Sequence, residues 1–348
     1  MALIFLEHCD NWNATASFTA RGWISSGSAS GGSAHLTGGR FGGGSLVRTL
    51  ANDNYTRGWY RDFSPSISVS VVHSAFWFLS TVSNPADLSY SNYINRATIG
   101  GNHCGVYSAT TDLLFRLGVP TAATGTWVGT AATNACDGGW HYIEYEIVLH
   151  QTTGTAKMWI DGQLDVNFSG ATCAAPPPLA LTRWLVGPHA PGTMDDMLIW
   201  DDTDTGDGWV GNLAGDARGF KTIRATSDAA VQFTPSRGSS NYALVNEQLA
   251  ATAGYVESGT DGHSDRYGFA AHGLSDLTPT GVIVETLASN PGAGTINVQM
   301  VAELGATVIE SAAKDVPGGW DYRKFRVWAM TMRGKETSYG TTQTAGYS

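Results

Sequence analysis

The sequence predicts an all-β protein built from two antiparallel units, and three observations lead to this prediction. Glycine contributes 43 of the 348 residues, well above the usual share of about 7%, which favours many tight turns. Charged residues make up only 14% of the chain, whereas 12 Trp and 13 Tyr favour strands. No long stretch has the apolar spacing of an amphipathic helix, but alternation of apolar and polar residues recurs.

The clearest strands lie in the middle of the chain. Residues 140–150, WHYIEYEIVLH, show an alternation of period two, and successive side chains of a strand point to opposite faces. One face carries the apolar residues and the other the polar residues, namely Ile143, Tyr145, Ile147 and Leu149 against Glu144, Glu146 and His150. Ala156–Ile160 alternates again, with Met158 and Ile160 inward, and Asp161-Gly162 is a strong hairpin signal. Three consecutive antiparallel strands are therefore expected.

Other alternating stretches are separated by loops rich in Gly, Ser, Thr and Asn. The expected strands are Ala2–Glu7, a short one around Ala34–Leu36, Ser45–Leu50, Ile67–Leu79, Gly105–Tyr107, Leu113–Gly118, Leu179–Gly187, Met197–Trp200, Gly281–Ala288, Thr295–Ala302, Ala306–Ser311 and Arg323–Met330. Hairpins are expected to join Gly281–Ala288, Thr295–Ala302 and Ala306–Ser311. The acidic, Gly-rich residues 201–216 predict a boundary between domains 1–205 and 206–348. The polar residues 334–348 are expected to be frayed or docked on a neighbour.

Charge and hydropathy exclude two classes of partner. The formal net charge is −10 and no basic stripe is present, so nucleic acid is a poor partner. No run of about 18 apolar residues is present, so no membrane insertion is expected. Leu3–Leu6 is too short an apolar run for a signal peptide, and synthesis in the cytoplasm is expected.

The four cysteines, Cys9, Cys104, Cys136 and Cys173, all lie in the first half of the chain. None forms a C-x-x-C pair, and four cysteines allow three disulfide connectivities between which the sequence does not choose. For a protein made in the cytoplasm, free and buried thiols are the favoured interpretation. A disulfide formed after release into an oxidising medium is the alternative.

The acidic stretch GTMDDMLIWDD has two aspartate pairs at the ends of one expected strand. The pairs Asp195-Asp196 and Asp201-Asp202 would lie about 17–20 Å apart, too far for a joint carboxylate site. Asp201, Asp202 and Asp204 alone form a weak candidate for calcium, but the spacing of a calcium loop is absent. No metal site and no cofactor is therefore favoured.

The sequence does not contain a recognisable catalytic arrangement. Glu144 and Glu146 would lie about 7 Å apart on one strand face, which is half of the acidic motif of jelly-roll glucanases, but a solvated strand face is the favoured interpretation. The histidines lack metal spacing. A nucleophile elbow and a phosphate-binding loop before a helix are both missing from the sequence. We therefore expect no enzymatic activity.

The aromatic residues suggest a different kind of site. Trp59, Tyr60, Trp127 and Trp159 are candidates for stacking on sugar rings. Most Trp residues of a β-sandwich are expected in its core, and Trp159 is the one expected to face outward.

The N-terminal part of the sequence also resembles a known family. The opening MALIFLEHCD, the central WHYIEYEIV with TGTAKMWIDG and the closing MDDMLIWDD resemble the concanavalin A-like (laminin-G-like) jelly-roll module of tailed-bacteriophage virion proteins. The similarity continues through LAGDARGFKTIRATSD, FTPSRGSSNYALVNE and GYVESGTDGHSDRYGF, to about residue 330. It implies an antiparallel jelly-roll sandwich followed by a second, smaller β-sandwich. It also implies that Met197–Trp200 pairs with Leu3–Leu6 and that Asp195 and Asp196 cap a turn.

The same resemblance implies a function. It predicts a non-enzymatic structural protein of the virion, either tail-associated (fibre, adaptor or tip) or a capsid-surface decoration. Its partners would be other virion proteins and, in a homo-oligomer, its own copies. A carbohydrate-binding protein that recognises a host surface glycan is the main alternative, and a polysaccharide-degrading jelly roll is the less favoured one. Relatives often have Phe where Cys9 stands, and their C-terminal strand region is longer, which leaves open completion of the C-terminal domain by another subunit.

Overall fold

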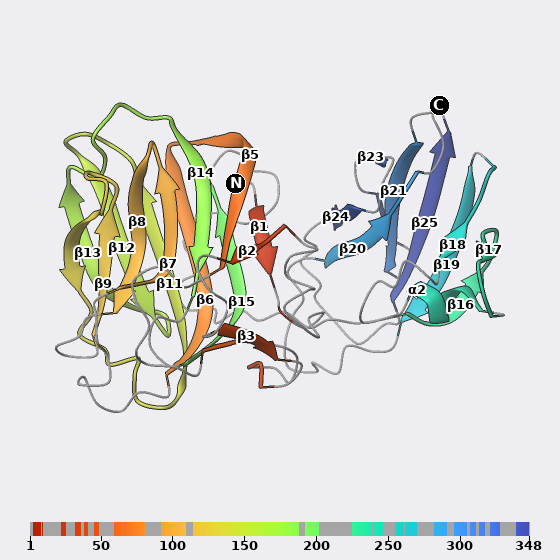
Figure 1. Ribbon diagram of the computed structural model, residues 1–348, viewed down its shortest axis with the longest axis horizontal. Coiled ribbons are helices and arrows are strands. Elements are labelled where there is room, and N and C mark those ends of the chain that lie inside the picture. The colour runs from red at the N-terminus through yellow and green to blue at the C-terminus, as the bar shows by residue number, and fades with distance from the viewer. Residues whose placement is uncertain are drawn as a thin grey trace. The chain divides into compact units, whose positions relative to one another are not determined.

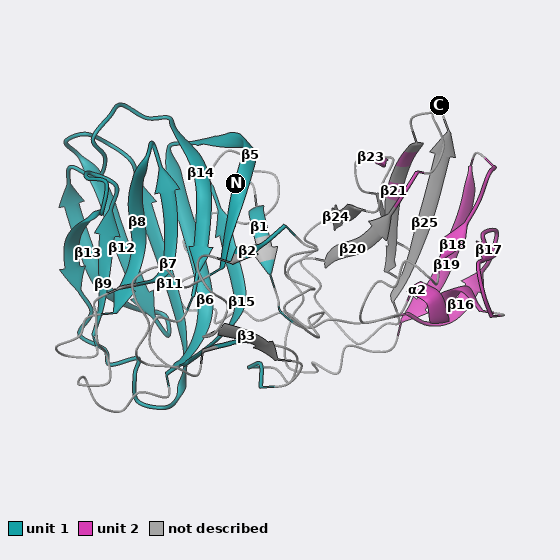
Figure 2. Cartoon of the chain, viewed as in Figure 1, with its two compact units in different colours: residues 1–222 teal, residues 223–348 magenta. Residues whose placement is uncertain are grey.

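The computed structural model divides the chain into two compact units, Met1–Thr222 and Ile223–Ser348 (Figure 2). The sequence places the domain boundary earlier, between residues 205 and 206, in an acidic segment that lies outside the described residues apart from Asp201. The structure describes residues 3–7, 9, 22–25, 32–35, 38–40, 45–48, 59–80, 92–108, 114–187, 192–201, 225–238, 240–245, 255–260, 262–269, 282–290, 296–304, 307–310, 313–316, 321–327 and 339–347. None of the helices in these ranges is long and apolar enough to span a membrane.

The first unit is a jelly-roll sandwich of two antiparallel sheets (Figure 1). One sheet has eight strands in the order β13-β12-β11-β6-β15-β4-β3, with β1 also pairing with β15. These strands are β1 (Leu3–Glu7), β3 (Gly32–His35), β4 (Ser45–Arg48), β6 (Val71–Ser80), β11 (Trp140–Val148), β12 (Gly154–Ile160), β13 (Gln163–Gly170) and β15 (Gly192–Trp200). The other has seven strands in the order β10-β9-β8-β7-β14-β5-β2. These are β2 (Ile24–Ser25), β5 (Trp59–Val69), β7 (Asn92–Ile99), β8 (Asn102–Ser108), β9 (Phe115–Val119), β10 (Thr126–Thr130) and β14 (Leu179–Val186).

The hydrophobic core lies between the two sheets. The eight-stranded sheet contributes Phe76, Phe78, Ile143, Tyr145, Ile147 and Met158, and the seven-stranded sheet contributes Ile94, Val106, Phe115, Leu117 and Trp184. The predicted inward residues Ile143, Tyr145 and Ile147 of β11 are buried, as is Leu149 just after it. Burying apolar side chains of this size contributes roughly 1.5–3 kcal/mol each, so this layer dominates the stability of the unit.

The first and last strands of the sandwich pair as the family resemblance implies. Leu3 pairs with Trp200 and Leu6 with Leu198. The expected turn at Asp195 and Asp196 is wrong, because β15 begins at Gly192 and both aspartates are buried within it. The strand absorbs them through a register shift between Asp195 and Leu198, with Asp196 at a φ of 46°. The Asp195 carboxylate accepts the Arg40 N–H at 2.8 Å, which offsets part of the cost of burying it.

Two further sequence predictions for this unit have clear outcomes. The three consecutive antiparallel strands are present as β11, β12 and β13. The turn between the last two has left-handed φ values of 50° at Asp161 and 80° at Gly162, as the Asp-Gly signal predicts. The single strand expected over Ile67–Leu79 is wrong. The chain bends at Ser70, so β5 and β6 lie in opposite sheets.

The second unit is smaller and also antiparallel. Its six-stranded sheet has the order β16-β19-β25-β21-β22, with β23 pairing with β21. Two-stranded sheets pair β17 with β18 and β20 with β24. The elements are β16 (Ala225–Ala230), β17 (Thr234–Pro235), α2 (Asn241–Val245), β18 (Val256–Glu257), β19 (His263–Phe269), β20 (Val282–Ala288), β21 (Ile296–Leu304), β22 (Thr307–Glu310), β23 (Lys314–Val316), β24 (Asp321–Val327) and β25 (Tyr339–Tyr347).

Two predictions for the second unit are corrected. Of the C-terminal residues 334–348, the structure describes 339–347, and these are not frayed, because β25 pairs with β19 on one side and β21 on the other. Backbone hydrogen bonds of the ladder hold this strand in place whatever the polarity of its side chains. The hairpin between β21 and β22 is present, whereas β20 pairs with β24 instead of β21.

A buried carboxylate organises the N-terminal part of the second unit. Asp265 on β19 accepts the backbone N–H groups of Gln232 and Phe233 with one oxygen. Its other oxygen accepts the Asn241 amide at 2.6 Å and the Tyr267 hydroxyl at 2.8 Å. Both oxygens therefore have partners, which makes this carboxylate a structural centre.

Candidate functional site

The outer face of the seven-stranded sheet, opposite the core, carries a row of residues that crosses six strands. The pairing registers align Tyr60, Leu185, Arg96, Gly105, Gly118 and Trp127, in that order, from β5 to β10. Residues paired across a sheet point to the same face. Five inter-strand steps of about 4.8 Å make this row about 24 Å long. We call it the transverse row.

Two tyrosines form the floor next to this row. The Tyr107 ring lies directly over Gly118, where the Cβ of any other residue would overlap with it. The Tyr93 ring lies against Tyr107 with 3.5 Å between ring centroids. Both hydroxyls donate hydrogen bonds to the carbonyl of Thr124, at 2.9 and 2.7 Å. The two rings are therefore fixed before any ligand arrives.

Trp127 is the exposed aromatic residue at the end of the transverse row. Its side chain is 49% exposed, and no other described tryptophan is classed as exposed. It lies edge-on to the Tyr107 ring, with 5.6 Å between the ring centroids. The Arg116 guanidinium lies 5.3 Å from its ring centroid. An exposed aromatic ring in this position can stack on a flat apolar face of a ligand.

An ion pair fixes the other end of the row. Arg183 on β14 donates two hydrogen bonds, of 2.6 and 3.1 Å, to the carboxylate of Asp62 on β5. The pKa of Arg183 is raised, chiefly by this pairing with Asp62. The Arg183 guanidinium also lies 4.0 Å from the centroid of the Tyr60 ring. Tyr60, which is half-buried, is therefore held between its strand and a cation.

His103 lies on the same face, one strand from Arg96. Its ring is 6.0 Å from the Tyr93 ring, and its Nδ1 atom is 3.3 Å from the Thr98 hydroxyl. Burial lowers the pKa of His103 to about 4, with further lowering by Arg96 and Arg183. The imidazole is therefore neutral near pH 7.

The sequence candidates for sugar stacking separate into two groups. Tyr60 and Trp127 belong to the transverse row, whereas Trp59 and Trp159 are each only 5% exposed. Trp159 points away from the core, as expected, but it is not open to solvent. Its strand does alternate, but the outer face of this sheet is buried over β6, β11 and β15 as well, as Trp77, Tyr142, Leu198 and Trp200 show.

The same burial changes the interpretation of the carboxylates on β11. Glu144 is fully buried, so the expectation of a solvated strand face is wrong at this position. Glu146 is 13% exposed and pairs with Lys157 at 3.3 Å. Asp202 and Asp204 of the calcium candidate lie outside the described residues, and Asp201 is buried. Among the described residues, no group of three His, Cys, Asp or Glu side chains has the arrangement of a metal site.

Most residues of this face are absent from the sequence-based candidates. These are Asp62, Tyr93, Arg96, His103, Tyr107, Arg116 and Arg183. Strands β7 and β10 were not predicted, because a register shift in each interrupts the alternation. The signal that remains is the local pattern of Ile94, Ala97 and Ile99, which are buried, with Arg96 and Thr98 on the other face.

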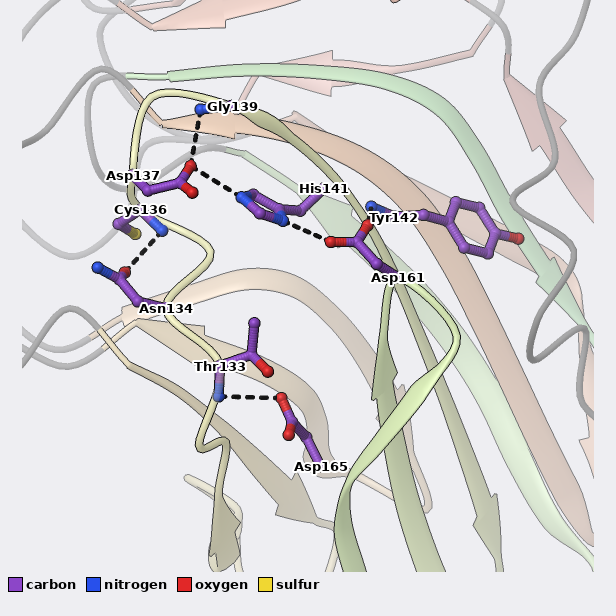
Figure 3. A network of polar contacts seen from close by, with 9 residues as sticks. All are labelled: Thr133, Asn134, Cys136, Asp137, Gly139, His141, Tyr142, Asp161 and Asp165. Carbon is purple, nitrogen blue, oxygen red and sulfur yellow. Dashed lines mark hydrogen bonds and ion pairs between the residues drawn. The ribbon is translucent and has the colours of Figure 1, made fainter.

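A second polar network lies between the β10–β11 loop and the turn after β12 (Figure 3). His141 contacts Asp161 through Nδ1 at 2.6 Å and Asp137 through Nε2 at 2.9 Å. Burial opposes protonation of His141, but hydrogen bonds to Asp137 and Asp161 outweigh it and raise its pKa. The hydrogen bond from His141 lowers the pKa of Asp137.

This network connects two segments of chain and leaves no imidazole nitrogen available for chemistry. Asp161 also accepts the Tyr142 N–H, and Asp137 accepts the Gly139 N–H. Two further side-chain oxygens, from Asn134 and Asp165, accept backbone N–H groups of the same loop. We therefore interpret it as a structural clasp.

The four cysteines are free thiols, and all are buried. Burial raises the pKa of Cys104 to about 12, so this thiol is protonated under ordinary conditions. Burial also raises the pKa values of Cys136 and Cys173. Thiols of this kind are poor nucleophiles and poor metal ligands.

No protein-family model and no curated protein matches the sequence. Several solved structures match part of the chain. The alginate lyase Aly36B is 11% identical, with a TM-score of 0.43, over 57% of this chain and 96% of its own. Domain 4 of AbnA, an extracellular arabinanase from Geobacillus stearothermophilus solved with arabinotriose, is 13% identical, with a TM-score of 0.40, over 57% and 92%. The cellulose-induced protein Cip1 is 14% identical, with a TM-score of 0.39, over 57% and 97%.

Proposed function

We propose that the protein binds carbohydrate on the outer face of the seven-stranded sheet of its N-terminal jelly roll. The exposed Trp127 ring carries this proposal, because a rigid aromatic face is what stacks on the apolar face of a sugar ring. The fixed Tyr60 lies at the other end of the transverse row. The length of the row, about 24 Å, suits an oligosaccharide better than a single sugar.

We also propose that this binding is not accompanied by hydrolysis of the glycan. Glycoside hydrolysis by the usual route uses two carboxyl groups about 5–10 Å apart. On the described part of this face the carboxylate is Asp62, and Arg183 already holds both of its oxygens. The described part of this face therefore offers no pair of carboxyl groups that could act as general acid and nucleophile.

Oligosaccharide binding by the full chain tests the proposal. A glycan array identifies a ligand, and calorimetry then compares wild type with Trp127→Ala. We expect at least a tenfold loss of affinity, since an aromatic anchor contributes on the order of 1.4 kcal/mol or more. Trp140→Ala, which removes a part-exposed tryptophan from the other sheet, serves as the matched control. Equal affinities of both variants and wild type would contradict the proposal, and release of reducing ends from the ligand would contradict its non-enzymatic part.

A second proposal concerns where the binding takes place. The order of the sequence motifs supports a component of a tailed-bacteriophage virion, in which case the bound carbohydrate would be a glycan of the host surface. Mass spectrometry of purified particles tests this directly. Hundreds of copies would indicate a capsid decoration or a major tail component, and about three to eighteen a fibre or tip. Absence of the protein from the particles would refute the virion proposal and leave carbohydrate binding untouched.

A further inference from the structure

Three nitrogen-bearing side chains lie on neighbouring strands at and next to the transverse row. Arg183 on β14, Arg96 on β7 and His103 on β8 come from three neighbouring strands. Thr98 pairs with Arg183 on one side and with His103 on the other, so Arg183, Thr98 and His103 lie in one line across the sheet. Arg96 lies two residues before Thr98 on the same strand and therefore on the same face. We call Arg96, His103 and Arg183 the cationic cluster.

The two arginines of the cluster differ in how their charge is balanced. The Arg183 guanidinium donates two hydrogen bonds to the Asp62 carboxylate. Arg96 has no carboxylate partner among the described residues, and its guanidinium lies 5.5 Å from the centroid of the Tyr93 ring. Its Nε–H is buried without a hydrogen-bond acceptor in the described structure. A buried donor on a charged group costs free energy unless something accepts from it.

The electrostatics of the cluster are unfavourable in the absence of a ligand. Burial lowers the pKa of Arg96, and the charge of Arg183 lowers it further. Burial lowers the pKa of His103 as well, and the charges of the two arginines lower it further. Yet the chain as a whole carries a formal net charge of −10. A positive region in an acidic protein, on the same sheet face as an exposed aromatic residue, is the arrangement expected where an anion binds.

We infer that the cationic cluster receives the anionic group of the bound glycan, a uronate carboxylate or a sulfate ester, so that the ligand is an acidic polysaccharide. This inference rests on the carbohydrate binding proposed above, and it names the class of ligand. The guanidinium of Arg96 presents parallel N–H donors that match the two oxygens of a carboxylate or sulfate. The Trp127 end of the row would then stack on sugar rings further along the same chain.

Calorimetry with four hexasaccharides tests the inference on the full-length protein. The probes are hexagalacturonate, its methyl ester, cellohexaose and a heparin hexasaccharide. We expect hexagalacturonate or the heparin fragment to bind at least about tenfold more tightly than the two uncharged probes. The methyl ester has the backbone of hexagalacturonate without its charge, and the heparin fragment distinguishes sulfate from carboxylate recognition.

Arg96→Gln supplies the residue-specific test. Affinity for the acidic probe should fall about tenfold or more, because the variant loses a charge-assisted hydrogen bond to the anion. Affinity for the uncharged probes should not change. Arg237→Gln, which removes an exposed arginine from the second unit, is the control for net charge. Circular dichroism checks that the Arg96 variant folds. In case it does not, wild type alone decides, because binding of the acidic probe should weaken with added salt and binding of a neutral probe should not.

The outcomes separate the two levels of the argument. Equal binding of acidic and uncharged probes, both abolished by Trp127→Ala, would overturn the acidic-ligand inference and support the proposed carbohydrate binding. Acidic-probe binding that survives Arg96→Gln with its salt dependence intact would also overturn it. Failure of wild type to bind any probe or any glycan of the array would overturn both.

Discussion

The two sheets of the N-terminal sandwich use their outer faces differently. In the eight-stranded sheet, β15 is buried at every position and β6 at nearly every position. In the seven-stranded sheet, β5 and β14 keep an alternation of buried and accessible residues. Tryptophan occurs on the outer face of both, as the buried Trp200 and the exposed Trp127. Because the residue type is the same, burial of the surrounding face decides whether a tryptophan stabilises the fold or is available to a ligand.

The largest expected effect tests this difference with one substitution on each sheet. Trp200 is fully buried and stacks on His73 at 5.1 Å. Trp200→Ala should therefore lower the free energy of unfolding by about 3–5 kcal/mol. Trp127→Ala should change it by less than about 1 kcal/mol, because the ring is half exposed. Urea unfolding followed by far-UV circular dichroism measures both. Similar losses in the two variants would mean that the sheets do not differ in the way described.

A glycine substitution tests the floor of the candidate site. A Cβ on Gly118 would overlap with the Tyr107 ring. Gly118→Ala should displace that ring, destabilise the protein by about 1–3 kcal/mol and weaken glycan binding together with stability. Gly259→Ala is the control, since its Cβ would meet no atom within 4 Å. If Gly118→Ala binds and unfolds like wild type, Tyr107 is not a fixed part of the site.

The sequence predicts the fold better than it predicts the site, for a physical reason. Alternation is a local signal, and in β11 and β12 it identifies the strands and their inward residues correctly. Whether the opposite face meets solvent depends on segments distant in sequence, which is why Glu144 and Trp159 were misplaced. Strand β7, which carries Arg96, went unrecognised because a register shift breaks its period. The glycines that accommodate Tyr107 become meaningful only when the strand order is known.

A smaller effect is expected from pH, through His103. Its pKa of about 4 is below the ordinary value of about 6.5, so in the free protein the ring takes up a proton only as the pH falls towards 4. The charged groups near it are Arg96 and Arg183, with Tyr93 beside the ring and Asp62 behind Arg183. A bound anion would favour the protonated ring and raise this pKa.

Affinity for an acidic glycan should therefore increase as the pH falls from about 6.5 towards 4, by about tenfold for each unit by which the ligand raises the pKa. Affinity for cellohexaose should stay constant over the same range. Calorimetry at several pH values measures both, and His103→Asn should remove the dependence. The outer face of the seven-stranded sheet would then differ from that of the other sheet in two ways, in its exposure to solvent and in a ligand affinity that depends on pH. A pH-independent affinity for the acidic probe would show that no anion approaches His103.

The smallest expected effect concerns the clasp of His141, which lies where β11 of the eight-stranded sheet begins. The folded state raises the pKa of His141, so its contribution to stability is complete below about pH 6.5 and is lost as the pH rises through the folded value. His141→Asn should cost roughly 1 kcal/mol at pH 6, a modest figure because Asp137 and Asp161 are exposed to solvent that screens them. At pH 9 the cost should be smaller.

Asn134→Ala, which removes a hydrogen bond to Cys136 N–H in the same loop without removing a titrating group, should cost the same at both pH values. Urea unfolding at the two pH values compares the variants. A cost for His141→Asn that does not change with pH would mean that packing of the ring, rather than its charge, joins the loop to the hairpin.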